Sequence, residues 1–199
     1  LHGATGHESS RVMIAEQFHK AIEAKIIPPA ILVIPNGGKR SEYRDWEPQR
    51  VMMETFLIRE LIPHIDATYR TIASRNGRHI EGMSMGGNGA LKLAFKYPQM
   101  FGSVVAYAGS YGPLPLDAKS EWVRQLAQWY SADDDVYVLA KRNRDALQDM
   151  RIRLVIGTKD VSWADSEKLH AALQEYGIAH EYEALLGVAH DNTVYYERA

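Results

Sequence analysis

Short apolar runs alternate with longer stretches of helical periodicity along this chain. Five runs are predicted to be strands: "AILVIP" (30–35), "RHIEG" (78–82), "GSVVAYAG" (102–109), "IRLVIG" (152–157) and "HEYEALLG" (180–187). The stretches predicted to be helical span 10–24, 48–69, 85–98, 118–130, 136–148 and 164–176. Continuous apolar runs are typical of strands buried on both faces, and strands that alternate with helices build a mainly parallel sheet. The sequence therefore predicts an α/β fold with helices on both faces of the sheet.

The composition is consistent with a single domain and excludes several classes of function. The 199 residues are 46% hydrophobic and 24% charged, which suits a single domain with a sizeable core. A net charge of −2 provides no basic surface to attract nucleic acid. No apolar run approaches the length of about 18 residues that a membrane span needs. The absence of cysteine excludes disulfides, thiolate metal sites and a cysteine nucleophile.

Three residues with catalytic chemistry directly follow predicted strands. Ser84 follows the strand at 78–82, Asp160 follows the strand at 152–157, and His190 follows the last strand. In open parallel sheets, sites lie beyond the carboxyl ends of the strands. Ser84 also lies in "GMSMG", which matches the G-x-S-x-G pattern of a nucleophile at a sharp strand-to-helix turn.

These residue types, in this order, suit nucleophilic catalysis. A serine hydroxyl is a weak nucleophile and needs a base, and an imidazole titrates near working pH. A carboxylate on the far ring nitrogen orients that imidazole. The order Ser84, Asp160, His190 is the order in which such a triad occurs on an α/β-hydrolase sheet.

Each assignment has an alternative. Ser84 could be one serine in a glycine-rich turn. Asp160 competes with Asp165, which could cap the helix at 164, and with the acidic run 133–135, which suits a loop or a helix cap. The other seven histidines lie in predicted helices, strands or the opening loop: His2, His7, His19, His64, His79, His170 and His180. Asp160 and His190 are preferred because of their positions after strands.

An ester carbonyl also needs backbone donors for its developing negative charge. One N–H is expected from Met85, the residue after the nucleophile, and the second from a loop that follows an early strand. "HGATG" (2–6) fits that loop, with Ala4 as the expected donor. Without Ser84, the same segment would be predicted to be a simple turn.

The chain resembles the esterase D-like family of α/β-hydrolases. The matching segments are "LHGATG", "ILVIPNGG", the stretch from "ETFLIRELIPHID" through "GMSMGGNGALKLAFKYP" to "VVAYAG", and later "GTKD" and "LHAALQEYGIAHEYEALLGVAHD". The family includes feruloyl and acetyl xylan esterases, enterochelin esterases, S-formylglutathione hydrolases and mycobacterial mycolyltransferases. The resemblance implies an α/β-hydrolase fold that here lacks the usual first strands, because the chain begins at the "HG" loop.

The resemblance also implies roles for particular residues. It implies Ser84 as nucleophile, Asp160 and His190 as its relay, and Ala4 and Met85 as oxyanion donors. Within a single domain of residues 1–199, the segment 110–150 would form a cap-like insertion over the site. Trp46, Tyr111, Trp122 and Trp129 are candidates for the substrate pocket, although ordinary packing would explain them equally well.

The resulting prediction is a serine carboxylic-ester hydrolase that acts on feruloyl, acetyl or similar esters. Transfer of the acyl group to a sugar hydroxyl, hydrolysis of an S-formylglutathione-type thioester, and a non-catalytic esterase-like binding module are the alternatives. No metal or organic cofactor is expected, and the partner is a small or carbohydrate-linked ester. Exposed strand edges make a homo-oligomer a further expectation. The carbohydrate-esterase resemblance favours a secreted or periplasmic location.

Overall fold

The main sheet has four parallel strands, which follow one another in chain order. The computed structural model describes residues 1–4, 6–46, 51–112 and 116–198. The strands are β3 (His79–Met83), β4 (Ser103–Tyr107), β5 (Arg151–Gly157) and β6 (Glu181–Leu185). A separate antiparallel pair joins β1 (Asp45–Trp46) to β2 (Val51–Met52). Four of the five predicted strands and their parallel arrangement are confirmed.

The register brings the carboxyl ends of the four strands to one edge. Met83 lies opposite Tyr107, and Tyr107 lies opposite Val155. Gly157, the last residue of β5, lies opposite Leu185, the last residue of β6. The loops that follow these strands therefore meet at a common edge.

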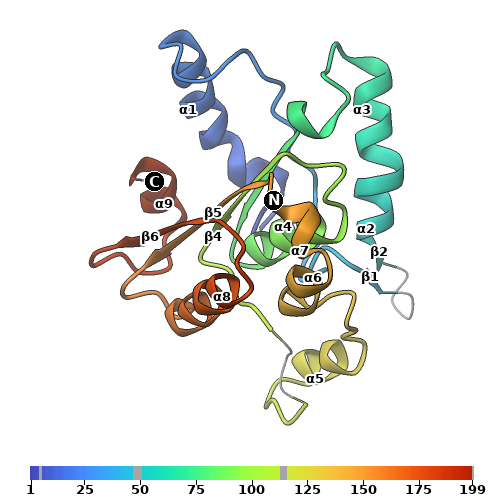
Figure 1. Ribbon diagram of the computed structural model, residues 1–199, viewed down its shortest axis with the longest axis vertical. Coiled ribbons are helices and arrows are strands. Elements are labelled where there is room, and N and C mark those ends of the chain that lie inside the picture. Colours follow the sequence, from blue (N-terminus) through green and yellow to red (C-terminus); the bar gives the residue numbers. More distant parts are fainter. Residues whose placement is uncertain (5, 47–50, 113–115, 199) are drawn as a thin grey trace.

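Helices occupy the segments between the strands (Figure 1). Near the amino end are η1 (Glu8–Arg11), α1 (Val12–Glu23), α2 (Met53–Thr55), the π-helical turn η3 (Phe56–Leu61), α3 (Ile62–Thr68) and η4 (Arg75–Gly77). The later helices are α4 (Met85–Lys96), α5 (Glu121–Gln128), α6 (Val136–Arg142), α7 (Arg144–Leu147), α8 (Trp163–Glu175) and α9 (Asn192–Arg198). The last of these, α9, was not predicted, because its short segment lacks a clear apolar stripe.

Two apolar clusters cover the two faces of the sheet. The larger packs side chains of α4, α6 and α8 against β4 and β5, as with Leu91, Leu139, Leu169, Val104 and Ile152. The smaller places α9 and the loop after β6 against the opposite face, with these members: Met83, Tyr107, Val155, Leu185, Val188 and Tyr195. Burial on both faces explains the continuous apolar runs of the strands.

The predicted strand at 30–35 is wrong. These residues form no strand, and Ile31 and Val33 keep 49% and 39% of their surface exposed. An apolar run becomes a buried strand only where a neighbouring strand supplies hydrogen bonds. In the described part of the chain, Leu1 lies beside β3, and its carbonyl accepts from the Met83 N–H. The run at 30–35 does not pair with β3.

The predicted insertion 110–150 contributes buried side chains to the main core. Val136, Leu139 and Leu147 of α6 and α7 belong to the larger apolar cluster. In contrast, α5 lies at the lower end of the molecule in Figure 1. Tyr111, which precedes α5, also belongs to the larger apolar cluster. The cap over the site stays a prediction. None of the described helices is both long and apolar enough to cross a membrane.

Candidate active site

Ser84 occupies a strained turn between β3 and α4. Its φ of 58° and ψ of −123° are unusual for a residue with a side chain. The Ser84 N–H donates to the carbonyl of Tyr107 at 2.9 Å, which fixes the turn against β4. Such a conformation costs about 1–3 kcal/mol and persists only where the surroundings enforce it.

The two glycines of the G-x-S-x-G pattern are required by close backbone contacts. A Cβ on Gly82 would lie 2.2 Å from the carbonyl oxygen of Gly86. A Cβ on Gly86 would lie 2.3 Å from the carbonyl oxygen of Leu1. Both distances are far below van der Waals contact, so a side chain at either position would displace the turn that presents Ser84.

Asp160 and His190 form the hydrogen-bonded pair that the sequence predicted. His190 Nδ1 lies 2.8 Å and 3.0 Å from the two carboxylate oxygens of Asp160. The Asp160 side chain is buried, whereas a third of the His190 side chain is exposed. Because the carboxylate accepts, Nδ1 carries the proton, and Nε2 remains available as a base.

Two further donors hold the Asp160 carboxylate. The Tyr195 hydroxyl donates to Oδ2 at 2.7 Å, and the Ser162 N–H donates to Oδ1 at 2.8 Å. Tyr195 also accepts from the Gly157 N–H at 2.7 Å, so it joins the carboxylate to the end of β5. Burial, together with the Asp160 acceptor, raises the pKa of Tyr195, which therefore stays a neutral donor. The role of Tyr195 could not be predicted from the sequence, because it depends on how α9 packs against the sheet.

Ser84 shares the sheet edge with this pair. It follows β3, and Asp160 and His190 follow β5 and β6. The described contacts include no hydrogen bond between the Ser84 hydroxyl and His190. The structure therefore brings Asp160 and His190 together, and the complete Ser84–His190–Asp160 relay stays a prediction.

The opening loop lies directly against Ser84. A Cβ on Gly3 would come within 3.3 Å of the Ser84 Cβ, so the loop approaches the nucleophile closely. Ala4 and Met85, the predicted oxyanion donors, both line a cavity with Ser84. Their roles as donors stay predictions.

His2 holds this loop in place. His2 is fully buried, and its Nε2 accepts from the Gly37 N–H at 2.8 Å. Its Nδ1 lies 2.8 Å from the Gly3 carbonyl and donates to it, because Nε2 is the acceptor. The Tyr43 hydroxyl donates to the His2 carbonyl at 3.0 Å. The sequence placed His2 in the opening loop and gave it no specific role. Its structural role depends on Gly37 and Tyr43, which lie 35 and 41 positions later in the chain.

Most of the residues that line the cavity beside Ser84 are polar or charged. Its volume is about 220 Å³. The lining residues come from the opening loop, the loop before β1, helix α4 and the segments after β4 and α5: Ala4, Glu42, Arg44, Ser84, Met85, Asn88, Lys92, Ser110, Gly112, Tyr130 and Asp134.

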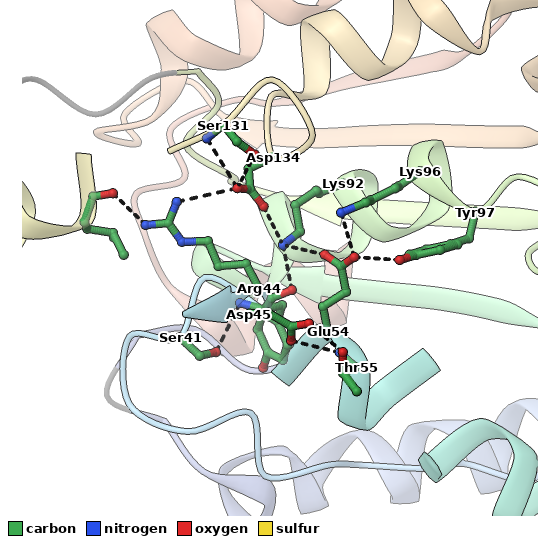
Figure 2. A network of polar contacts seen from close by, with 12 residues as sticks. Ser41, Arg44, Asp45, Glu54, Thr55, Lys92, Lys96, Tyr97, Ser131 and Asp134 are labelled. Atoms are coloured by element: carbon green, nitrogen blue, oxygen red, sulfur yellow. Dashed lines mark hydrogen bonds and ion pairs between the residues drawn. The ribbon is translucent and has the colours of Figure 1, made fainter. Parts of the chain in front are cut away.

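Three charged residues of the cavity, Arg44, Lys92 and Asp134, belong to a network of polar contacts (Figure 2). The buried Lys92 ammonium donates to the Tyr43 carbonyl at 2.6 Å and lies 3.4 Å from Asp134 and 3.5 Å from Glu54. Glu54 in turn contacts Lys96 at 2.7 Å and accepts from the Tyr97 hydroxyl at 2.6 Å. The network therefore ties α4 to α2 and to the segment before α6.

Burial shifts the pKa values of the acidic and the basic residues that line the cavity in opposite directions. Burial raises the pKa of Glu42, although Arg44, Lys92 and Asn88 oppose that change. Burial lowers the pKa of Lys92 and of Arg44, against the attraction of Asp134. The acidic run 133–135, which includes Asp134, was predicted to be a loop or a helix cap. Asp135 of the same run caps α6, because its carboxylate accepts from the N–H groups of Tyr137 and Val138.

The described side chains among the aromatic residues predicted to line the pocket do not line the cavity beside Ser84. Trp46 and Tyr111 are buried, and neither lines the cavity beside Ser84. Trp129 is 55% exposed, and the side chain of Trp122 lies outside the described part of the chain. Tyr130, next to Trp129, lines the cavity instead. Across the described residues no group of three His, Asp or Glu side chains is arranged to hold a metal ion.

Comparison with known sequences places the chain among esterases. The family model Esterase, described as "Putative esterase", matches residues 2–199. Esterase Rv1288 of Mycobacterium tuberculosis (strain ATCC 25618 / H37Rv) is 30% identical over 200 residues, which cover 80% of this chain and 41% of that protein. S-formylglutathione hydrolase of Paracoccus denitrificans (strain Pd 1222) is 30% identical over 53% of this chain and 36% of its own length. The chain thus spans about two fifths of the length of these curated relatives.

Solved structures show the same fold. A ferulic acid esterase superimposes with a TM-score of 0.84 at 21% identity, covering 98% of this chain and 78% of that one. FphF, a fluorophosphonate-binding serine hydrolase of Staphylococcus aureus, gives a TM-score of 0.81 at 19% identity, covering 98% and 77%. These likenesses confirm the predicted α/β-hydrolase fold.

Proposed function

Because the chain belongs to the "Putative esterase" family, we propose that it hydrolyses carboxylic esters with Ser84, His190 and Asp160 as its catalytic residues. The observation that carries this proposal is the Asp160–His190 hydrogen bond, at the same sheet edge as the strained Ser84 turn. A histidine held by a buried carboxylate is the base that a serine nucleophile requires. Both groups reach this edge because the four strands are parallel and in register.

The proposed reaction proceeds through an acyl-enzyme. The Ser84 oxygen attacks the ester carbonyl carbon while its proton passes to His190 Nε2. The resulting oxyanion accepts hydrogen bonds from the N–H groups of Ala4 and Met85. The tetrahedral intermediate then expels the alcohol, which takes the proton from His190. Water repeats the sequence on the acyl group and restores the free serine.

Feruloyl, acetyl or similar esters are the proposed substrates. One structural neighbour is named a ferulic acid esterase, and one curated relative is named an S-formylglutathione hydrolase. Transfer of the acyl group to a sugar hydroxyl would use the same residues. Analysis of the products with and without a sugar acceptor separates hydrolysis from transfer.

Replacement of the nucleophile tests the proposal. Ser84→Ala should lower kcat for p-nitrophenyl acetate by about 10⁴-fold or more, because the remaining groups cannot form the acyl-enzyme. A fluorophosphonate probe should label the wild-type chain at Ser84 and leave the variant unlabelled. Far-UV circular dichroism should be unchanged.

Ser103→Ala is the matched control, because Ser103 begins β4 at the opposite edge of the sheet. It should retain both hydrolysis and labelling. Full turnover by Ser84→Ala would disprove the assignment.

A further inference from the structure

Two histidines outside the cavity form a direct contact between α8 and the start of β6. His170 lies on α8, and His180 immediately precedes β6. The Nδ1 atom of His170 is 2.7 Å from the Nε2 atom of His180, and the two ring centroids are 5.0 Å apart. Both side chains are partly buried, and neither lines the cavity beside Ser84.

The backbone before β6 fixes the direction of this hydrogen bond. His180 Nδ1 lies 2.8 Å from the Ile178 carbonyl oxygen, which can only accept. His180 Nδ1 therefore carries a proton, and in the neutral ring Nε2 is the acceptor. His170 Nδ1 must then donate to it. The pair is held by one N–H···N hydrogen bond that requires an unprotonated His180 Nε2.

Neighbouring side chains hold the two rings in place. The His170 ring stacks on the Tyr182 ring, with centroids 4.2 Å apart and an interplanar angle of 14°. The Tyr182 hydroxyl donates to the carboxylate of Glu167, which lies one turn earlier on α8. Leu169 and Ile178, which are close in sequence to the two histidines, are buried in the larger apolar cluster. The pair therefore lies at the border of the main core.

The carboxylates of β6 are on the other face of the sheet. Glu181 and Glu183 both form ion pairs with Arg153 of β5 there, because successive residues of a strand point to opposite faces. Among the described residues, no ion pair joins a carboxylate to the ring of His170 or of His180. A second positive charge in this pair would therefore have no direct counter-ion.

The two rings cannot both be protonated and keep this contact. A proton on His170 Nε2 leaves the hydrogen bond intact, since Nδ1 still donates. A proton on His180 Nε2 removes the acceptor, so that two N–H groups face each other and two like charges repel. Burial lowers the pKa of His180, and the neighbouring His170 adds to that change, whereas the Ile178 carbonyl opposes it.

We propose that His170 and His180 form an acid-sensitive joint between α8 and β6, which is closed while His180 is neutral and opens when both rings are protonated. The joint connects the two elements that carry the Asp160–His190 pair, because α8 follows Asp160 and β6 precedes His190. It acts on the stability of this part of the fold, whether or not the chain hydrolyses esters.

The stabilisation that this joint supplies is present at neutral pH. Because folding lowers the pKa of His180, the unfolded chain binds the proton more readily, and the free energy of unfolding decreases as the pH falls. The stabilisation is complete above a pH of about 6.5, the ordinary pKa of histidine. It is lost as the pH falls through the lower pKa of His180 in the folded chain.

Nitrogen-15 NMR of the folded chain tests the protonation pattern. At pH 7.5 His180 should be neutral with its proton on Nδ1, and its pKa should lie below about 6.5. His170→Phe should raise that pKa, because the neighbouring charge is gone, and His180→Phe identifies the His180 signals by their loss. A neutral His180 that carries its proton on Nε2, or a pKa at or above about 6.5, would overturn the proposal.

Urea denaturation at pH 7.5 and at pH 5.0 measures the effect on stability. Between these pH values, the folding equilibrium constant of the wild-type chain should fall about 5-fold or more beyond the fall measured for His180→Phe, which cannot take up the proton. His64→Phe, at an exposed histidine of α3, is the matched control and should follow the wild type. Equal pH dependence of the wild type and His180→Phe contradicts the joint. If His180→Phe does not fold, the NMR titration of the wild-type chain decides.

Discussion

Single residues at the sheet edge show how the chain prepares a reactive group. Ser84 has a positive φ, and a side chain at the neighbouring Gly82 or Gly86 would collide with backbone atoms. Asp160 is surrounded by donors from His190, Tyr195 and Ser162, so its oxygens are hydrogen-bonded although it is buried. The geometry of the site therefore depends on residues that would not contact a substrate.

Tyr195 offers a test at this scale. Tyr195→Phe should lower the free energy of unfolding by about 1–3 kcal/mol, because the buried Gly157 N–H and one Asp160 oxygen each lose a partner. It should also lower kcat/KM about 10-fold, since the carboxylate that orients His190 becomes less constrained. Urea denaturation and ester hydrolysis measure the two effects. Tyr69→Phe, at an exposed tyrosine, should change neither, and an unaltered Tyr195→Phe would remove the residue from the site.

Among the secondary-structure elements, α4 connects the site to the rest of the fold. Ser84 precedes its first turn, and Lys92 and Lys96 lie on its later turns. Lys92 is 1% exposed and close to both Glu54 of α2 and Asp134 before α6. Helix α4 thus joins the nucleophile to two segments that are distant in sequence.

Lys92→Met tests this connection. The substitution should lower the free energy of unfolding by about 1–3 kcal/mol, because the buried Tyr43 carbonyl loses its donor. The Glu54 and Asp134 carboxylates each lose one cation, while Lys96 and Arg44 remain beside them. Urea denaturation followed by circular dichroism gives the value.

Lys20→Met is the control, because Lys20 pairs with Glu16 on the exposed surface of α1. It should leave stability nearly unchanged. If the two variants are equally stable, the Lys92 network does not stabilise the fold.

The whole 199-residue molecule exposes apolar residues between α1 and the loop before β1. Ile26, Ile31 and Val33 keep 77%, 49% and 39% of their surface exposed. Exposed apolar side chains of this kind favour association. The expected homo-oligomer stays a prediction, and this surface is where we expect it to form.

Light scattering on the purified chain tests that expectation. The wild type should exceed the monomer mass of 22.5 kDa, and the double variant Ile31→Lys, Val33→Lys should return to it. The comparison is Val161→Lys, which alters an exposed valine after β5 and should leave the mass of the wild type unchanged. A monomeric wild type would contradict the prediction.

Much of the architecture could be predicted because its signals are local. The runs that became β3, β4, β5 and β6 are short and apolar, and the helices between them repeat at helical spacing. The positions of Asp160 and His190 followed from the ends of their strands. The failure at 30–35 has a non-local cause, since a strand needs a neighbour that the local sequence does not specify.

The sequence by itself determined the α/β class and the order Ser84, Asp160, His190, because apolar periodicity and glycine placement act on adjacent residues. Only the tertiary structure decided that Glu42, Arg44, Lys92 and Asp134 line the cavity beside Ser84. A charged side chain is buried only where distant segments supply its partners, and that information lies in the packing of loops and helices rather than in any local pattern.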